Sequence, residues 1–155
     1  MKTLIVYYSR TWTTKQAAQT LASRFDADLC EIIDKKDRSW AIWWIVSGKD
    51  ATLKNITEIE DVNLDIQSYE LVIIGTPVRA WLMTPAIRTF IQKFDDKLSK
   101  VAVFTTQMWE SLQRYQQEFE EIFGKRLKTV SFFLTKDVKK NNLDTKIDEF
   151  IKNIN

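Results

Sequence analysis

The sequence predicts an α/β domain in which a parallel β-sheet is covered by helices on both faces. Short apolar runs of strand length alternate with amphipathic segments of helical spacing along the chain, which is the order expected of strand–helix–strand units. The strand-like runs are continuously apolar, so each is expected to be buried on both faces. A length of 155 residues fits one domain, and we expect a single domain over residues 1–155.

Three strands and one clear helix are predicted in the first half. Residues 4–8 form a β-branched and aromatic run that favours a buried strand. Apolar residues recur at helical spacing over 13–25 and predict an amphipathic helix. The runs 27–33 and 70–75 predict the second and third strands, and 41–53 is compatible with a further helix.

Helices and strands continue to alternate in the second half. Pro85 suits the first turn of a helix, where its missing N–H has no cost. Gly124 is a candidate C-cap, because helices commonly end on a glycine with a left-handed backbone. The predicted elements are a helix over 85–94, a strand over 100–105, a helix over 109–123, a strand over 127–134 and a helix over 142–154.

Composition excludes several function classes. The chain carries 23 Lys and Arg against 21 Asp and Glu, and a net charge of +2 is no footprint for a protein that binds nucleic acid. The absence of histidine excludes Ser-His-Asp and Cys-His catalysis. Cys30 is the one cysteine, so no intramolecular disulfide forms and no metal site is expected.

The apolar runs are too short for targeting or membrane insertion. The N-terminal run of 4–8 is interrupted by Ser9 and Arg10 and does not resemble a signal peptide. The longest apolar window, Trp40 to Val46, is far below the ~20 residues needed to cross a bilayer. We therefore expect a cytoplasmic protein without a membrane partner.

Hydroxyl side chains gather directly after the first predicted strand. In parallel sheets, ligands bind at the carboxyl ends of the strands. The segment from Ser9 to Thr14 holds four hydroxyls in six residues and leads into a helix. A helix N-terminus with added hydroxyls can bind a phosphate group without a lysine. The alternative is that these side chains only cap the helix.

Two segments of the chain resemble the flavodoxin family. Lys2 to Thr14 is similar to the family's first strand and its S/T-x-T-x-x-T phosphate loop. Val72 to Val78, followed by Met83 to Phe90, resembles the third strand, the flavin loop and the next helix. The resemblance covers nearly the whole chain in the right order, and the two segments together are a specific signal.

This resemblance implies a flavodoxin-like three-layer sandwich with a five-stranded parallel sheet of order 2-1-3-4-5. It implies non-covalent FMN, and the length suits a short-chain member. Residues at the phosphate would come from the first loop, and residues beside the isoalloxazine from the two loops after the third and fourth strands. The implied cofactor-binding residues are Ser9, Arg10, Thr11, Trp12, Thr13, Thr14, Thr76, Pro77, Val78, Arg79, Ala80, Trp81, Thr105, Thr106, Gln107, Met108 and Trp109.

Three functions remain open from the sequence. The first is an FMN electron carrier, and the second is an FMN-dependent oxidoreductase of a small acceptor such as a quinone or porphyrinogen. The third is a flavin-free domain in which Trp12, Trp81 and Trp109 obstruct the site. No catalytic side chain is expected, because a flavin supplies the chemistry. Expected partners are a redox protein or a small electron acceptor, and the expected state is a monomer or weak homodimer.

Charge and one arginine bear on that choice. Carrier flavodoxins are usually strongly acidic, and opposite charge speeds docking to redox partners. A net charge of +2 therefore weakens the carrier hypothesis. Arg79 is a candidate for substrate contact, although an exposed loop arginine without a role is an equal alternative.

Glycine is scarce and tryptophan abundant. The chain has 3 Gly, where average usage predicts about 11, and 6 Trp. Trp12, Trp40, Trp81 and Trp109 stand where members of the family carry glycine. One hypothesis joins these facts: UGA codons, which some bacterial lineages read as glycine, have been translated as tryptophan. The alternative is genuine loss of the cofactor site.

Overall fold

The computed structural model describes residues 1–35, 56–78, 83–110 and 113–154. Helix α1 begins and ends at the residues predicted, as do α3 and β5. The principal elements are β1 (Thr3–Tyr7), α1 (Thr13–Phe25), β2 (Asp28–Glu31), β3 (Leu71–Pro77), α3 (Pro85–Phe94), β4 (Lys100–Gln107), α4 (Gln113–Phe123), β5 (Leu127–Leu134), α5 (Thr135–Lys139) and α6 (Asp144–Ile154).

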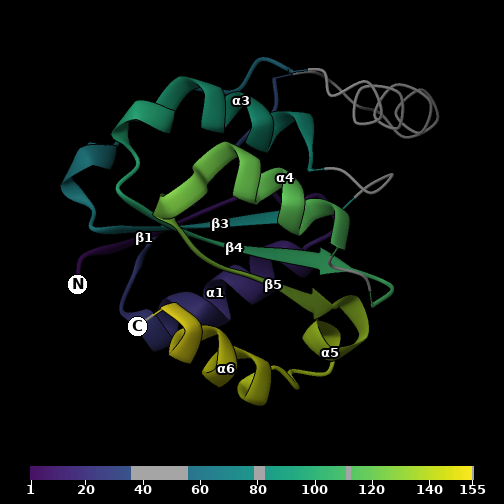
Figure 1. Ribbon diagram of the computed structural model, residues 1–155. Coiled ribbons are helices and arrows are strands. Elements are labelled where there is room, and N and C mark those ends of the chain that lie inside the picture. Colours follow the sequence, from purple (N-terminus) through teal and green to yellow (C-terminus); the bar gives the residue numbers. More distant parts are fainter. Residues whose placement is uncertain (36–55, 79–82, 111–112, 155) are drawn as a thin grey trace.

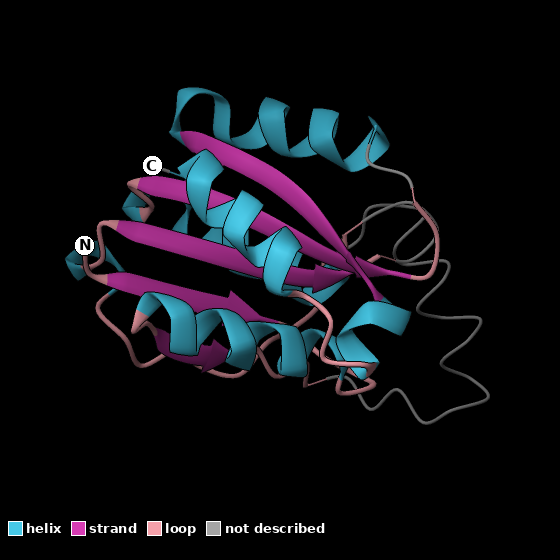
Figure 2. Cartoon of the chain, turned by 90° about the horizontal axis from the view of Figure 1, so that it is seen from below, coloured by secondary structure: helices cyan, strands magenta, loops and turns pink. Residues whose placement is uncertain are grey.

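The five strands form one sheet in the order β2-β1-β3-β4-β5, and every neighbouring pair is parallel. Figure 1 shows the resulting layers: α3 and α4 cover one face of the sheet, and α1, α5 and α6 cover the other. Figure 2, turned by 90°, shows the helices lying alongside the strands. The predicted three-layer sandwich and its strand order are confirmed.

Two apolar cores explain why the strands are continuously hydrophobic. On β1, Leu4 and Val6 belong to the core beneath α3 and α4, whereas Ile5 and Tyr7 belong to the core beneath α1 and α6. Successive side chains of a strand point to opposite faces, so a strand between two helical layers needs apolar residues at every position.

The structure departs from the prediction at several boundaries. Strand β2 is shorter than the predicted 27–33, and β4 continues past the predicted end at Thr105. The short helix α5 was missed because five residues with one buried side chain, Val138, carry no periodic pattern. Gly124 has a φ of +52°, as expected for a glycine that ends a helix. The helix considered over 41–53 lies outside the described residues.

Candidate functional site

The segments that follow β1 and β3 are hydrogen-bonded to the ends of the neighbouring strands at the carboxyl edge of the sheet. The Tyr8 N–H donates to the Gly75 carbonyl at 3.1 Å, and the Val78 N–H donates to the Thr106 carbonyl at 3.1 Å. The hydroxyl oxygens of Thr14 and Thr106 lie 2.7 Å apart and connect the start of α1 to the end of β4. The structure thus joins the three predicted loops in one place.

The first loop is fixed at the start of α1 by one of its own hydroxyls. The Ser9 hydroxyl accepts the N–H of Lys15 at 3.0 Å, which satisfies one of the amides that a helix N-terminus leaves without a carbonyl partner. Thr13 and Thr14 open the helix, so their amides also lack an intrahelical partner. Ser9 therefore acts as the helix cap, while the amides of Thr13 and Thr14 are placed to bind an anion.

The hydroxyls of Thr13 and Thr14 differ in their hydrogen bonding. The side chain of Thr13 is 6% exposed, and within the described ranges its hydroxyl makes no hydrogen bond to another residue. The Thr14 hydroxyl, in contrast, is paired with Thr106. Arg10 and Thr11 are exposed at the same loop. A buried hydroxyl beside a helix N-terminus is chemically suited to a phosphate oxygen, so this end of the loop is compatible with a phosphate group.

The loop after β3 is anchored where it leaves the sheet and where it returns. Thr76 is fully buried, and its hydroxyl oxygen lies 3.2 Å from that of Thr84, just before α3. The Thr84 N–H also donates to the Thr76 hydroxyl at 3.4 Å. Pro77 and Val78 are half-buried. Residues 79–82, which include the predicted Arg79, Ala80 and Trp81, lie outside the described residues.

Gln107 organises the loop after β4. The Thr105 hydroxyl donates to its side-chain carbonyl at 3.0 Å, and its side-chain amide donates to the carbonyl of Trp109 at 2.6 Å. The Thr135 hydroxyl donates to the Gln107 main-chain carbonyl at 3.2 Å. Met108 and Trp109 are exposed by 72% and 73%. The hydrogen bonds of Gln107 therefore fix the backbone of this segment, while the side chains of Met108 and Trp109 face solvent.

Trp12 does not fill the site with its ring. The residue is 71% exposed, and the Lys15 ammonium nitrogen lies 4.9 Å from the ring centroid. Trp109 is equally exposed. Neither indole is packed into the core between the loops, so these two tryptophans give no support to the obstructed, flavin-free alternative.

A hydrogen-bonded trio that sequence analysis missed lies beside the first loop. The Tyr7 hydroxyl donates to Glu31 at 3.2 Å, and the Lys15 ammonium donates to the same carboxylate oxygen at 2.8 Å. Burial, reinforced by the charge and hydrogen bond of Glu31, raises the pKa of Tyr7 to about 12. Tyr7 and Glu31 are register partners of β1 and β2, and pairing across strands is not readable from local sequence.

This trio predicts a loss of stability in alkaline solution. The folded protein holds the Tyr7 proton more tightly than the unfolded chain, whose tyrosine pKa is near 10. The contribution of Tyr7 is therefore complete below pH 10 and is lost as pH rises towards about 12. We expect the urea midpoint of Tyr7→Phe to fall less steeply over this range than that of the parent protein. Equal slopes for the two proteins would contradict the assignment.

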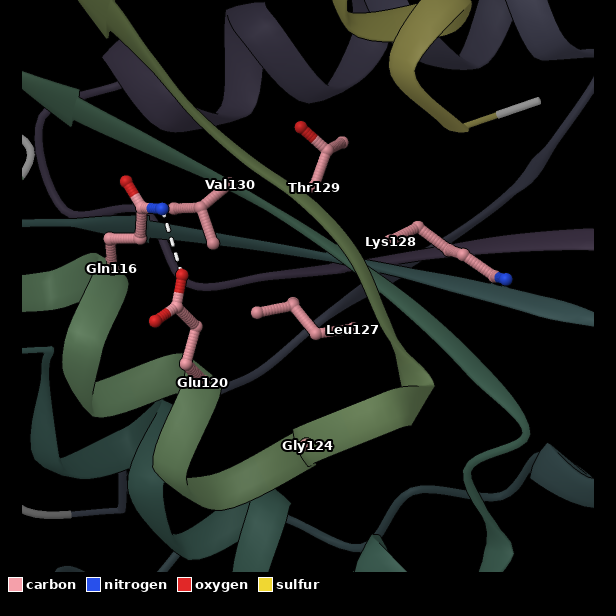
Figure 3. A pocket seen from close by; sticks show the side chains of 7 residues that line it. All are labelled: Gln116, Glu120, Gly124, Leu127, Lys128, Thr129 and Val130. Atoms are coloured by element: carbon pink, nitrogen blue, oxygen red, sulfur yellow. Dashed lines mark hydrogen bonds between the residues drawn. The ribbon is translucent and has the colours of Figure 1, made fainter.

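A hollow lies away from the carboxyl edge of the sheet. It has a volume of about 260 Å³ and is situated between α4 and β5 (Figure 3). Its strand residues come from the first half of β5, Leu127 to Val130, and so from the amino end of the sheet. The side-chain amide of Gln116 donates to Glu120 at 2.8 Å within it. Ligands of parallel sheets bind at the opposite end, so we do not assign the cofactor here.

Solved structures of flavoproteins and flavodoxins are similar to this chain over most of its length. A flavoprotein from Lactobacillus acidophilus NCFM, crystallised in complex with FMN, is 28% identical, with 90% of this chain and 97% of that chain covered and a TM-score of 0.72. The apo form of the flavoprotein from the same organism, solved by NMR, is 26% identical, with 96% of each chain covered and a TM-score of 0.69. Two-electron reduced Megasphaera elsdenii flavodoxin, at 14% identity, covers 86% of this chain and 85% of its own with a TM-score of 0.57, a likeness of fold alone.

Comparison with sequences gives the family. No curated protein matches the chain. The family model described as flavodoxin matches residues 2–150, nearly the full length. The match includes β1 with its hydroxyl-rich loop, the loop after β3 and the loop after β4, which are the segments that the structure joins at one edge. The predicted resemblance is therefore confirmed, and the chain belongs to the flavodoxin family.

Proposed function

We propose that the carboxyl edge of the sheet binds FMN non-covalently and that the chain acts as a flavodoxin-like redox protein. The observation that carries the proposal is the joining of three loops at one place, through the Thr14–Thr106 hydroxyl pair and the Val78–Thr106 main-chain bond. Family membership supports it, as does the similar L. acidophilus flavoprotein in complex with FMN.

The phosphate end of the site would be built from neutral donors. The amides of Thr13 and Thr14 begin α1, Thr11 precedes the helix by two residues, and the Ser9 hydroxyl holds the loop by accepting the Lys15 N–H. The positive end of the helix dipole adds to their attraction for a dianion. Lys15 is not needed for this purpose, because its ammonium is paired with Glu31.

The ring end would be formed by the loops after β3 and β4. The segments are 76–81 and 105–109, within which Thr76 and Gln107 fix the backbone. Bound FMN supplies transfer of one or two electrons, and the chain orients the ring and tunes it through main-chain hydrogen bonds and stacking. No side chain is assigned a role as nucleophile or general base.

Thr13→Val tests the phosphate end. Valine keeps the shape of threonine and removes the hydroxyl that has no partner among the described residues. A hydrogen bond to a charged group contributes roughly 1.5–3 kcal/mol, so FMN affinity should fall roughly tenfold to a hundredfold. The affinity for riboflavin, which lacks the phosphate, should stay the same. Both are measured by titration with flavin fluorescence.

The matched control is Thr20→Val in the middle of the same helix. The Thr20 hydroxyl donates to the Gln16 carbonyl within the helix and is remote from the carboxyl edge. We expect this variant to bind FMN as the parent protein does. An equal loss for both variants, or a loss of riboflavin binding with Thr13→Val, would contradict a phosphate site at the start of α1.

Electron transfer to a redox partner protein is the first assignment, and oxidoreduction of a small acceptor is the second. The near-neutral net charge of +2 favours the second, since it offers little steering towards a charged partner. A cytoplasmic location is part of this proposal and rests on the expectation from the sequence alone. The described helices include no candidate membrane span. Reduction of the FMN-loaded protein by NAD(P)H without another protein would support the enzyme, and no reduction would support the carrier.

A further inference from the structure

Position 12 has a backbone conformation that suits glycine. Trp12 precedes α1 with φ 66° and ψ −19°, in the left-handed region. The other described residues with positive φ are Asp26, Asn141 and Gly124, all of types that adopt this region readily. A tryptophan there carries the steric cost of its Cβ, and its side chain makes no capping hydrogen bond.

The contacts of the Trp12 side chain do little to offset this steric cost. Its ring is 71% exposed, and Lys15, whose ammonium lies over the ring, is already paired with Glu31 at 2.8 Å. Trp109 is likewise exposed on its loop. Tryptophan is highly buried on average in folded proteins. In the described part of this chain, however, the large fully buried side chains are phenylalanine and aliphatic residues. The two described tryptophans therefore do not pack as tryptophan usually does.

The amino-acid composition gives independent support for glycine at positions where the sequence has tryptophan. The chain has 3 Gly against about 11 expected, and 6 Trp, at positions 12, 40, 43, 44, 81 and 109. We propose that position 12 is glycine in the protein as its own cells make it, because its codon is UGA and is read there as glycine. A glycine would adopt φ 66° without strain and would remove a large side chain from the start of α1.

The peptide of residues 11–15 decides the identity of position 12. Trypsin releases it by cleaving after Arg10 and Lys15. Mass spectrometry of protein isolated from its own cells should show Thr-Gly-Thr-Thr-Lys, and codon 12 should be UGA. A UGG codon, or tryptophan in that peptide, would overturn the proposal. This measurement does not depend on cofactor binding, so it is distinguishable from a failure of the proposed function.

Recombinant variants test the backbone argument. Trp12→Gly should have a higher urea midpoint than the parent protein and than Trp12→Ala, because alanine retains the Cβ. Trp109→Gly is the matched control, since Trp109 is as exposed but is not among the residues with positive φ, and no gain is expected. A midpoint for Trp12→Gly no higher than that for Trp12→Ala would overturn the inference.

The same variants connect position 12 to the proposed cofactor site. If FMN phosphate binds at the start of α1, Trp12→Gly should bind FMN at least as tightly as the parent, because the exposed ring of Trp12 makes no contribution to the site. If neither protein binds FMN, the proposed function fails, and the peptide of residues 11–15 still decides which residue the native protein carries.

Discussion

Replacing Arg88 by methionine is expected to destabilise the protein by about 3–5 kcal/mol, the range for breaking a buried ion pair. Arg88 of α3 and Glu118 of α4 form an ion pair at 2.9 Å, with side chains only 12% and 9% exposed. Removing the guanidinium takes one charged partner away from a carboxylate that is shielded from solvent between two helices. Urea unfolding followed by circular dichroism measures the change in unfolding free energy.

Two further variants isolate the effect of burial. Arg24 pairs with Asp148 between α1 and α6, but both side chains are largely exposed, so Arg24→Met should cost less than about 1 kcal/mol. The double variant Arg88→Met with Glu118→Met should regain most of the stability, because no buried charge remains. A loss under about 1 kcal/mol for Arg88→Met alone would show that the Glu118 carboxylate does not depend on Arg88 for its stabilisation.

Replacing Gly75 by alanine is expected to cost stability near the upper end of about 1–3 kcal/mol, the range for overpacking a core. A Cβ at Gly75 would lie 2.3 Å from the ring of Phe104, which is fully buried and packed 5.4 Å from the ring of Phe133. The strand or the ring must therefore move. Because Gly75 lies near the end of β3 and the loop after this strand is part of the proposed site, FMN binding should weaken as well.

The control for Gly75→Ala is Gly124→Ala. Gly124 has a φ of +52°, and a Cβ added there would meet no heavy atom within 4 Å, so the cost is conformational only, about 1 kcal/mol. Replacing the Phe104 ring by leucine in the Gly75→Ala protein should restore part of the lost stability, because the smaller side chain leaves room for the added Cβ. A Gly75→Ala protein as stable as the parent would contradict the close approach of β3 to Phe104.

The fold was predictable because its strands are buried on both faces. Residues 70–75 and 100–105 are continuously apolar, and the helices over 13–25 and 85–94 have clear apolar faces, so local pattern was sufficient to identify these elements. The strand order followed from family resemblance. The short α5 lacks any such pattern, and β2 is a short edge strand whose ends are set by its pairing with β1.

The sequence was sufficient to predict which loops form the site, but not which hydrogen bonds connect them. The hydroxyls of residues 9–14 and the end of β4 were identified from sequence, since strand ends of a parallel sheet share one edge. The pairing of Thr14 with Thr106, separated by 92 positions, depends on how α1 packs against β4. The same is true of Arg88 with Glu118. The backbone conformation of the loop decides that the Ser9 hydroxyl bonds the Lys15 N–H, whereas the Thr13 hydroxyl bonds no other residue in the described part of the chain.

Mapping of amide chemical shifts during an FMN titration tests the cofactor site most directly. With assigned ¹H–¹⁵N spectra, the largest shifts should fall on Thr13 and Thr14, on the residues that follow Thr76 and on the segment from Thr105 to Trp109, with saturation at one equivalent. Shifts centred on the hollow between α4 and β5, or no shifts at any FMN concentration tested, would contradict the assignment of FMN to the carboxyl edge of the sheet.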